Sequence, residues 1–128
     1  MKIASLIARI LLGALFVFAG ANHLFNFFGK QPLPPGVAGQ FLGAMISSGY
    51  MYFIGFCQVA AGLMLLFNRF VPLGLVILAP VIVNILVVDI LMAPIGLPVG
   101  VLVVILWCLT AWRVRSMLHP LLTRRVAD

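Results

Sequence analysis

The stretch Phe70 to Met92, FVPLGLVILAPVIVNILVVDILM, decides the fold. It is apolar, and a helix that rises about 1.5 Å per residue makes it long enough to cross a hydrocarbon core about 30 Å thick. It nevertheless contains Asn84 and Asp89, and Asp89 is the only acidic residue before the C-terminal Asp128. Because a carboxylate is costly in lipid, such residues usually face protein or water. The stretch therefore predicts a membrane-spanning helix with polar side chains turned inward.

The composition agrees with a membrane protein. Hydrophobic residues make up 65% of the chain and charged residues only 8%. Water-soluble domains are about half apolar and about a quarter charged. We therefore expect residues 1–128 to form a single transmembrane domain.

The rest of the chain divides into three further apolar runs, separated by turns. The expected spans cover residues 3–28, 50–67, 70–92 and 96–112, followed by a basic tail over 113–128. The Pro-rich break at 32–36 precedes Val37, Phe41, Ala44 and Met45, whose helical spacing indicates a short helix that lies on the membrane surface or in the mouth of the bundle. The predicted fold is an all-α, integral membrane four-helix bundle with a short amphipathic helix between transmembrane helices 1 and 2.

The start of the chain has a rival interpretation as a cleaved signal peptide. Lys2, the apolar run that follows it and the small residues at 19–21 imitate such a segment. Arg9 interrupts that pattern. We therefore treat the first run as a spanning helix.

The net charge of +6 is distributed unevenly. Seven of the eight Lys and Arg residues belong to one side of the membrane: they lie at the start of span 1, in the turn between spans 2 and 3, or after span 4. Only Lys30, in the loop after span 1, lies on the opposite side. By the positive-inside rule, both termini are expected in the cytoplasm. This rule accounts for the basic charge without nucleic acid.

Glycines mark where the helices are expected to approach one another. Close packing through small residues is how membrane helices associate. The positions concerned are Gly13 and Gly20 in span 1, Gly55 and Gly62 in span 2, and Gly96 and Gly100 at the start of span 4.

The polar residues of the spans fall at similar depths. Helical rise places His23 ~8 Å below the outer end of span 1, with Asn22 slightly deeper, and Gln58 and Asn84 ~12 Å down. Asp89 falls ~4 to 5 Å below the end of span 3. These five residues predict an outward-facing polar ligand pocket, with Asn84 as its floor and Asp89 as a gate residue at its rim.

Two details of this pocket are hypotheses with simpler alternatives. His23 paired with Asp89 would support proton exchange near neutral pH, and Pro80 is expected to kink span 3 below Asn84. Against this, His23 can simply meet interfacial water. Gln58 and Asn84 can act as interhelical hydrogen-bond partners worth about 1 kcal/mol each.

The remaining reactive residues point to no chemistry of their own. Cys57 and Cys108 differ in expected depth by more than a disulfide allows, and we expect buried structural thiols. His119 has no evident partner. The sequence has no C-x-x-C motif, metal-ligand spacing, nucleotide loop or nucleophile triad, so neither a catalytic residue nor a metal site is predicted.

Taken together, the order and spacing of several short motifs resemble those of the DoxX family of small four-helix membrane proteins. The motifs are RILLG at 9–13, AGANHLF at 19–25, PLPPG at 32–36, SGY at 48–50, GLMLL at 62–66, NRFVPL at 68–73 and APVIVNI at 79–85. The resemblance implies a four-helix transmembrane fold in a bacterial-type inner membrane. It also implies an association with membrane redox systems, since some relatives are subunits of quinone-linked sulfur oxidation or partners of oxidative-stress enzymes.

This chain departs from the family pattern at two positions. The family commonly has Glu where this chain has Gln58, and often His where it has Asp89. A proton-carrying role for that Glu could not be performed by Gln58. The related fold class of vitamin K epoxide reductase relies on paired cysteines, which are absent here, and this disfavours thiol–disulfide catalysis.

The leading functional hypothesis is a non-catalytic accessory or partner subunit of a membrane redox or quinone-linked system. Its pocket would bind a quinone or a similar amphiphile, with Phe25, Phe27 and Tyr50 as apolar lining. Its partners would be the lipid bilayer and a membrane or periplasmic redox protein, and self-association stays open. The alternative is a small transporter or proton-linked permease subunit. An enzyme with its own redox centre ranks last.

Overall fold

The computed structural model describes residues 2–25, 33–92 and 94–122, and these residues are almost entirely helical. The elements are α1 (Lys2–Phe25), α2 (Gly36–Ser48), α3 (Tyr50–Leu66), α4 (Val71–Leu91), the short 3₁₀ helix η1 (Pro94–Gly96), α5 (Leu97–Arg113), α6 (Arg115–Leu118) and the 3₁₀ helix η2 (His119–Leu122). No strand occurs within these described ranges. The predicted all-α class is confirmed.

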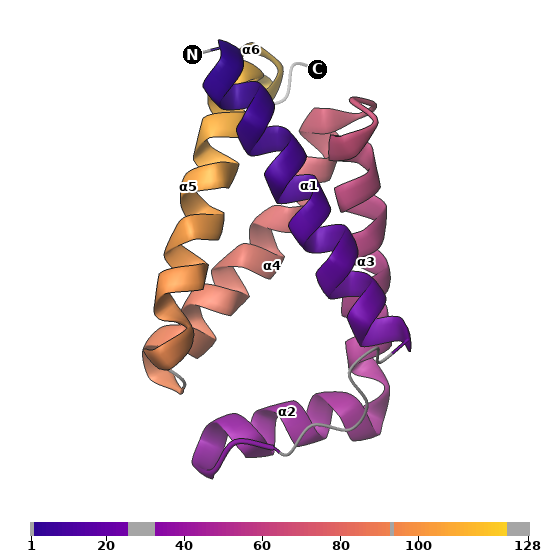
Figure 1. Cartoon of the computed structure of the whole chain (residues 1–128), viewed down its shortest axis with the longest axis vertical. Helices are drawn as coiled ribbons and strands as arrows, with labels where there is room; N and C mark the ends of the chain where they lie inside the picture. Colours follow the sequence, from indigo (N-terminus) through magenta and orange to yellow (C-terminus); the bar gives the residue numbers. More distant parts are fainter. Residues whose placement is uncertain (1, 26–32, 93, 123–128) are drawn as a thin grey trace, which may run out of the picture.

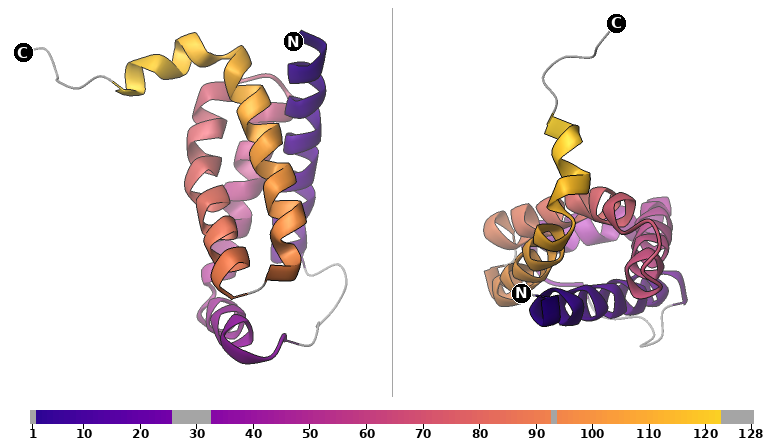
Figure 2. Two further views of the ribbon diagram at one scale, coloured as in Figure 1. Left: turned by 90° about the vertical axis from the view of Figure 1, so that its left-hand side faces the viewer. Right: turned by 90° about the horizontal axis from the view of Figure 1, so that it is seen from above.

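Four of the helices form the bundle, and α2 lies across one end of it (Figure 1). Helix α1 packs against α3 and α5, α3 packs against α4, and α4 packs against α5, so the four helices close into a ring (Figure 2). The N-terminal end of α1 and the C-terminal end of α5 lie together at the opposite end from α2. We refer to these as the terminal end and the α2 end.

Three or four of the helices are able to cross a membrane. Helix α1, helix α4 and the stretch Pro94–Arg113 are each long and apolar enough to do so. Helices α2 and α3 meet the same test only as a pair, and they are bent by 86° at their junction. Large apolar side chains are exposed along the outside of the bundle, as lipid contact requires. The chain is therefore a multi-pass membrane protein.

The junctions between helices follow from a few backbone positions. At Gly49 the chain adopts a left-handed φ of 80°, and the Gly49 N–H donates to the carbonyl of Ile46, which ends α2 and starts α3 in a new direction. Asn68 and Phe70 also have left-handed φ values, of 54° and 55°, in the tight turn between α3 and α4. This turn makes α3 and α4 antiparallel neighbours.

The seam between α1 and α3 consists of the glycines that the sequence singled out. A Cβ at Gly13 would lie 2.9 Å from the Gly62 carbonyl oxygen, and one at Gly62 would lie 2.8 Å from the Gly13 carbonyl oxygen. A Cβ at Gly20 would lie 2.5 Å from the carbonyl oxygen of Gly55. The two backbones therefore touch directly, in a contact that only glycine permits.

Side-chain hydrogen bonds tie α5 to its neighbours. The Ser5 hydroxyl of α1 donates to the carbonyl of Leu109 at 3.1 Å. The Trp107 indole N–H donates to the carbonyl of Leu75 in α4 at 3.0 Å. An apolar core fills the middle of the bundle between the two ends, with Leu12, Leu65, Leu75 and Leu78 fully buried.

Candidate functional site

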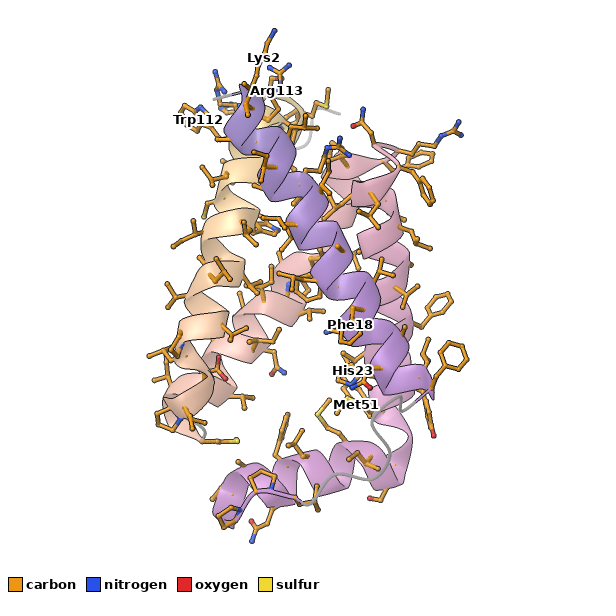
Figure 3. All side chains as sticks on the ribbon, viewed as in Figure 1. Lys2, Phe18, His23, Met51, Trp112 and Arg113 are labelled. Carbon is orange, nitrogen blue, oxygen red and sulfur yellow. The ribbon has the colours of Figure 1, made fainter. Side chains whose placement is uncertain are left out.

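A cavity of about 810 Å³ lies at the α2 end of the bundle, between the C-terminal part of α1 and helices α2, α3 and α4. Its wall is mostly apolar: α2 contributes Phe41, Leu42 and Met45, and the remainder comes mainly from α3 and α4. Figure 3 shows two lining residues, His23 and Met51, close together at this end of the bundle. Helix α2 thus closes the end of the bundle and forms one wall of the cavity.

Four of the five predicted pocket residues line this cavity. They are His23 from α1, Gln58 from α3, and Asn84 and Asp89 from α4. Asn22 is half-buried and is not one of the lining residues. The structure therefore brings together four polar side chains from three helices, and a ligand role for them stays a prediction.

Gln58 is the most deeply buried polar group of the cavity. Its residue is only 4% exposed, and its Oε1 atom has no hydrogen-bond partner within the described ranges. A buried polar atom left without a partner costs about 1–3 kcal/mol. Asn84, which the sequence predicted as the floor, is exposed on the cavity wall. Depth alone suggested Asn84, but Gln58 is the polar lining residue that is both buried and without a partner among the described residues, and we therefore take Gln58 as the floor.

Asp89 is also buried, at 9% exposed, and its Oδ2 atom lacks a partner among the described residues. The carboxylate is packed against α5: a Cβ at Gly96 would lie 2.7 Å from Oδ1, and one at Gly100 would lie 2.5 Å from Oδ2. The side chain is therefore buried and not exposed at an open rim, and a gating role for Asp89 stays a prediction. The two glycines expected to mark a close approach of helices do lie against α4, and they leave room for its carboxylate.

His23 and Asp89 do not form the predicted charge pair. Within residues 2–25, 33–92 and 94–122 no ion pair joins them; Asp89 is packed against α5, whereas the Cβ of His23 lies 3.0 Å from a Cβ position at Gly55 in α3. The two residues lie on walls of the cavity formed by different helices. Equal depth did not imply contact.

The aromatic lining also differs from the prediction. Tyr50 lines the cavity, and its ring lies 6.1 Å from that of Phe53, which the sequence reasoning missed. Phe25 is 71% exposed and does not line the cavity. Phe27 lies outside the described residues. The recurrence of Phe41 and Met45 at helical spacing was the available signal for the α2 wall.

The sequence singled out three further residues, and the kink expected at Pro80 stays a prediction. Pro80 lies inside α4, which continues through it, and the proline ring lines the cavity. Both cysteines are free, as expected, but neither is buried: Cys57 is half-buried and lines the cavity, and Cys108 is exposed on α5. Among the described residues, no group of three or more His, Cys, Asp or Glu is placed to hold a metal ion.

The fold and its exposed apolar surface define a small multi-pass helical membrane protein. A family model described as DoxX matches residues 4–90, which run from α1 to near the end of α4. The chain belongs to the DoxX family. Searches of curated proteins and of solved structures gave no match.

Proposed function

We propose that this protein binds a small amphiphile of the quinone or quinol class in the cavity at the α2 end, as an accessory subunit of a membrane redox system. The observation that carries the proposal is the unpartnered Oε1 of Gln58 at the floor of a largely apolar cavity. Ligand sites of this kind combine an apolar wall with a few directed polar groups, in volumes of about 300–1,000 Å³.

The polar groups suit the head of such a molecule. A quinol hydroxyl donates a hydrogen bond, and the Gln58 oxygen is an acceptor without a donor among the described residues. The Gln58 amide and the His23 ring can also donate to a quinone carbonyl. The apolar side chains of α2, including Phe41 and Met45, would then cover the ring and the beginning of the tail.

A binding role rather than independent catalysis follows from the chemistry of the floor. An amide does not titrate in the physiological range, so Gln58 can position a quinol hydroxyl without accepting its proton. Electrons and protons would therefore pass to a partner redox protein. We place the chain in a bacterial-type inner membrane with both termini cytoplasmic, so that the cavity opens outward.

The apolar core supports binding over transport. Along α1, Leu12 and Phe16 lie between the residues that line the cavities at the two ends of the bundle, and Leu75 does the same along α4. In the part of the chain that the structure describes, this layer offers no polar step for an ion or a proton across the middle of the bundle.

The test is a thermal-unfolding titration of the purified protein with a short-chain quinol. A ligand at one hundred times its Kd should stabilise the native state by about 2.7 kcal/mol. Gln58→Met keeps the side-chain size and removes the hydrogen bond, so it should weaken binding about tenfold. Leu63→Met, an exposed position on the same helix, is the matched control and should bind like the wild type. An unchanged melting temperature at saturating quinol and quinone would contradict the proposal.

A further inference from the structure

A second cavity, of about 300 Å³, lies at the terminal end of the bundle, far from the proposed quinol site. Three cationic side chains line it: Lys2 and Arg9 from α1, and Arg113 from the end of α5. Figure 3 shows Lys2 and Arg113 together at this end. None of the lining residues is acidic; of the two acids in the chain, Asp89 lines the other cavity and Asp128 lies outside the described residues.

The neutral hydroxyls of this cavity are already engaged as donors. Ser5 donates to the Leu109 carbonyl at 3.1 Å, and Thr110 donates to the Leu106 carbonyl at 2.9 Å. Both residues are buried. A ligand must therefore be recognised mainly by the cationic groups and by the Asn68 amide, which also lines the cavity.

Arg9 is the innermost of the cations. It is half-buried, and its guanidinium donates a hydrogen bond to the carbonyl of Leu65 at the end of α3. That bond fixes the guanidinium at a helix C-terminus, where a positive charge is favoured. Among the described residues it uses one of the five N–H groups of the side chain, and the others can donate to an anion.

We propose that this cavity binds a phosphate group, either in the headgroup of an anionic phospholipid or on a free phosphate-bearing solute. Three cations brought together without an acidic neighbour among the described residues repel one another, and a bound anion removes that repulsion. Basic pockets between transmembrane helices are suited to phosphate headgroups. Leu6, Val71 and Val114 complete the wall, and this apolar part suits the glycerol and acyl portion of a lipid. The proposal does not depend on the quinol site.

Native mass spectrometry of the full-length protein tests the proposal. The number of bound lipids is measured in a titration with phosphatidylglycerol. A titration with phosphatidylcholine is the zwitterionic reference. The phosphatidylglycerol titration is then repeated with excess inorganic phosphate. We expect preferential binding of phosphatidylglycerol, weakened about tenfold or more in the double variant Lys2→Gln/Arg113→Gln. Arg9 is left intact because its bond to Leu65 is part of the fold.

The matched control is the double variant Arg69→Gln/Arg115→Gln. It also removes two positive charges, from exposed residues that do not line the cavity. We expect this control to bind like the wild type. Competition by inorganic phosphate, or binding of phosphate in the absence of a lipid preference, would identify a solute as the source and support the phosphate site. Two results would overturn the proposal. Equal weakening of phosphatidylglycerol binding in both double variants would show diffuse attraction to the basic surface. Binding of neither phosphatidylglycerol nor inorganic phosphate in preference to phosphatidylcholine would show that there is no phosphate site.

Discussion

At the scale of single residues, the least ordinary feature is the Asp89 carboxylate between α4 and α5. It fills the space that Gly96 and Gly100 leave free, and its Oδ2 atom has no hydrogen-bond partner among the described residues. A buried carboxylate in this state is costly. The family match ends at residue 90, so the glycines that accommodate Asp89 lie beyond it. We infer that the acid and the two glycines form one packing unit.

Gly100→Ala tests that unit. The added Cβ would lie 2.5 Å from the Asp89 Oδ2 atom and 3.3 Å from the Leu86 Cδ2 atom, so the carboxylate must move. Overpacking of this kind should destabilise the fold by about 1–3 kcal/mol. The measurement is the free energy of unfolding in mixed micelles. In a double-mutant cycle, Asp89→Ala should remove most of the cost of Gly100→Ala. Additive effects of the two changes would show that the residues do not form a unit.

The residue scale also shows how far depth could be read from the sequence. Helical rise is nearly constant, so counting residues placed His23, Gln58, Asn84 and Asp89 at one end of the bundle, where they line one cavity. Counting could not give the direction of each side chain around its helix. That direction depends on which faces the neighbouring helices cover. Depth therefore did not predict that Asn84 is exposed and Asp89 buried, and it suggested a charge pair that does not form; Asn22 does not line the cavity.

At the scale of the helices, the seam between α1 and α3 is the most extensive contact of the bundle. It is antiparallel, so glycines spaced seven apart in one helix meet glycines spaced seven apart in the other. This regular spacing was visible in the sequence. The glycine pattern predicted that helices approach one another at these positions, because close backbone contact excludes every larger residue, but it did not predict which helices meet.

Gly20→Ala should open this seam. The new Cβ would lie 2.5 Å from the Gly55 carbonyl oxygen and 2.9 Å from the backbone nitrogen of Val59, and backbone atoms cannot move aside as a side chain can. We expect destabilisation of about 1–3 kcal/mol in the same unfolding assay. Gly43→Ala is the matched control, because among the described residues its Cβ would meet only Leu33 Cδ1, at 3.4 Å. Equal stability of the two variants would contradict direct contact of the backbones.

Helix α2 was predictable in existence but not in position. The prolines before it and the helical spacing within it indicated a short helix. Its 86° bend from α3 depends on the left-handed conformation of Gly49, which a glycine permits but does not require. The side that faces the cavity, formed by Phe41, Leu42 and Met45, follows from that bend.

At the scale of the whole molecule, the two ends of the bundle differ in charge. The cavity at the terminal end is lined by three cations, and the cavity at the α2 end by Asp89 and neutral or weakly basic polar groups. The apolar core separates them. The sequence predicted this difference between the ends. The residue type gives the sign of each charge, and its position in the chain gives the end of the helix on which it lies. The shape of either cavity required the packed structure.

The charge asymmetry predicts the orientation, and reporter fusions measure it. The terminal end carries Lys2, Arg9, Arg69 and Arg113, so the positive-inside rule places it in the cytoplasm. Green fluorescent protein fused after the last residue should fluoresce, and alkaline phosphatase fused at the same point should be inactive. Alkaline phosphatase fused after Ser48, at the α2 end, should be active, because that end would face outward. Active phosphatase at the C-terminus would reverse the orientation: the quinol site would then open to the cytoplasm, and the phosphate site would lie in the outer leaflet.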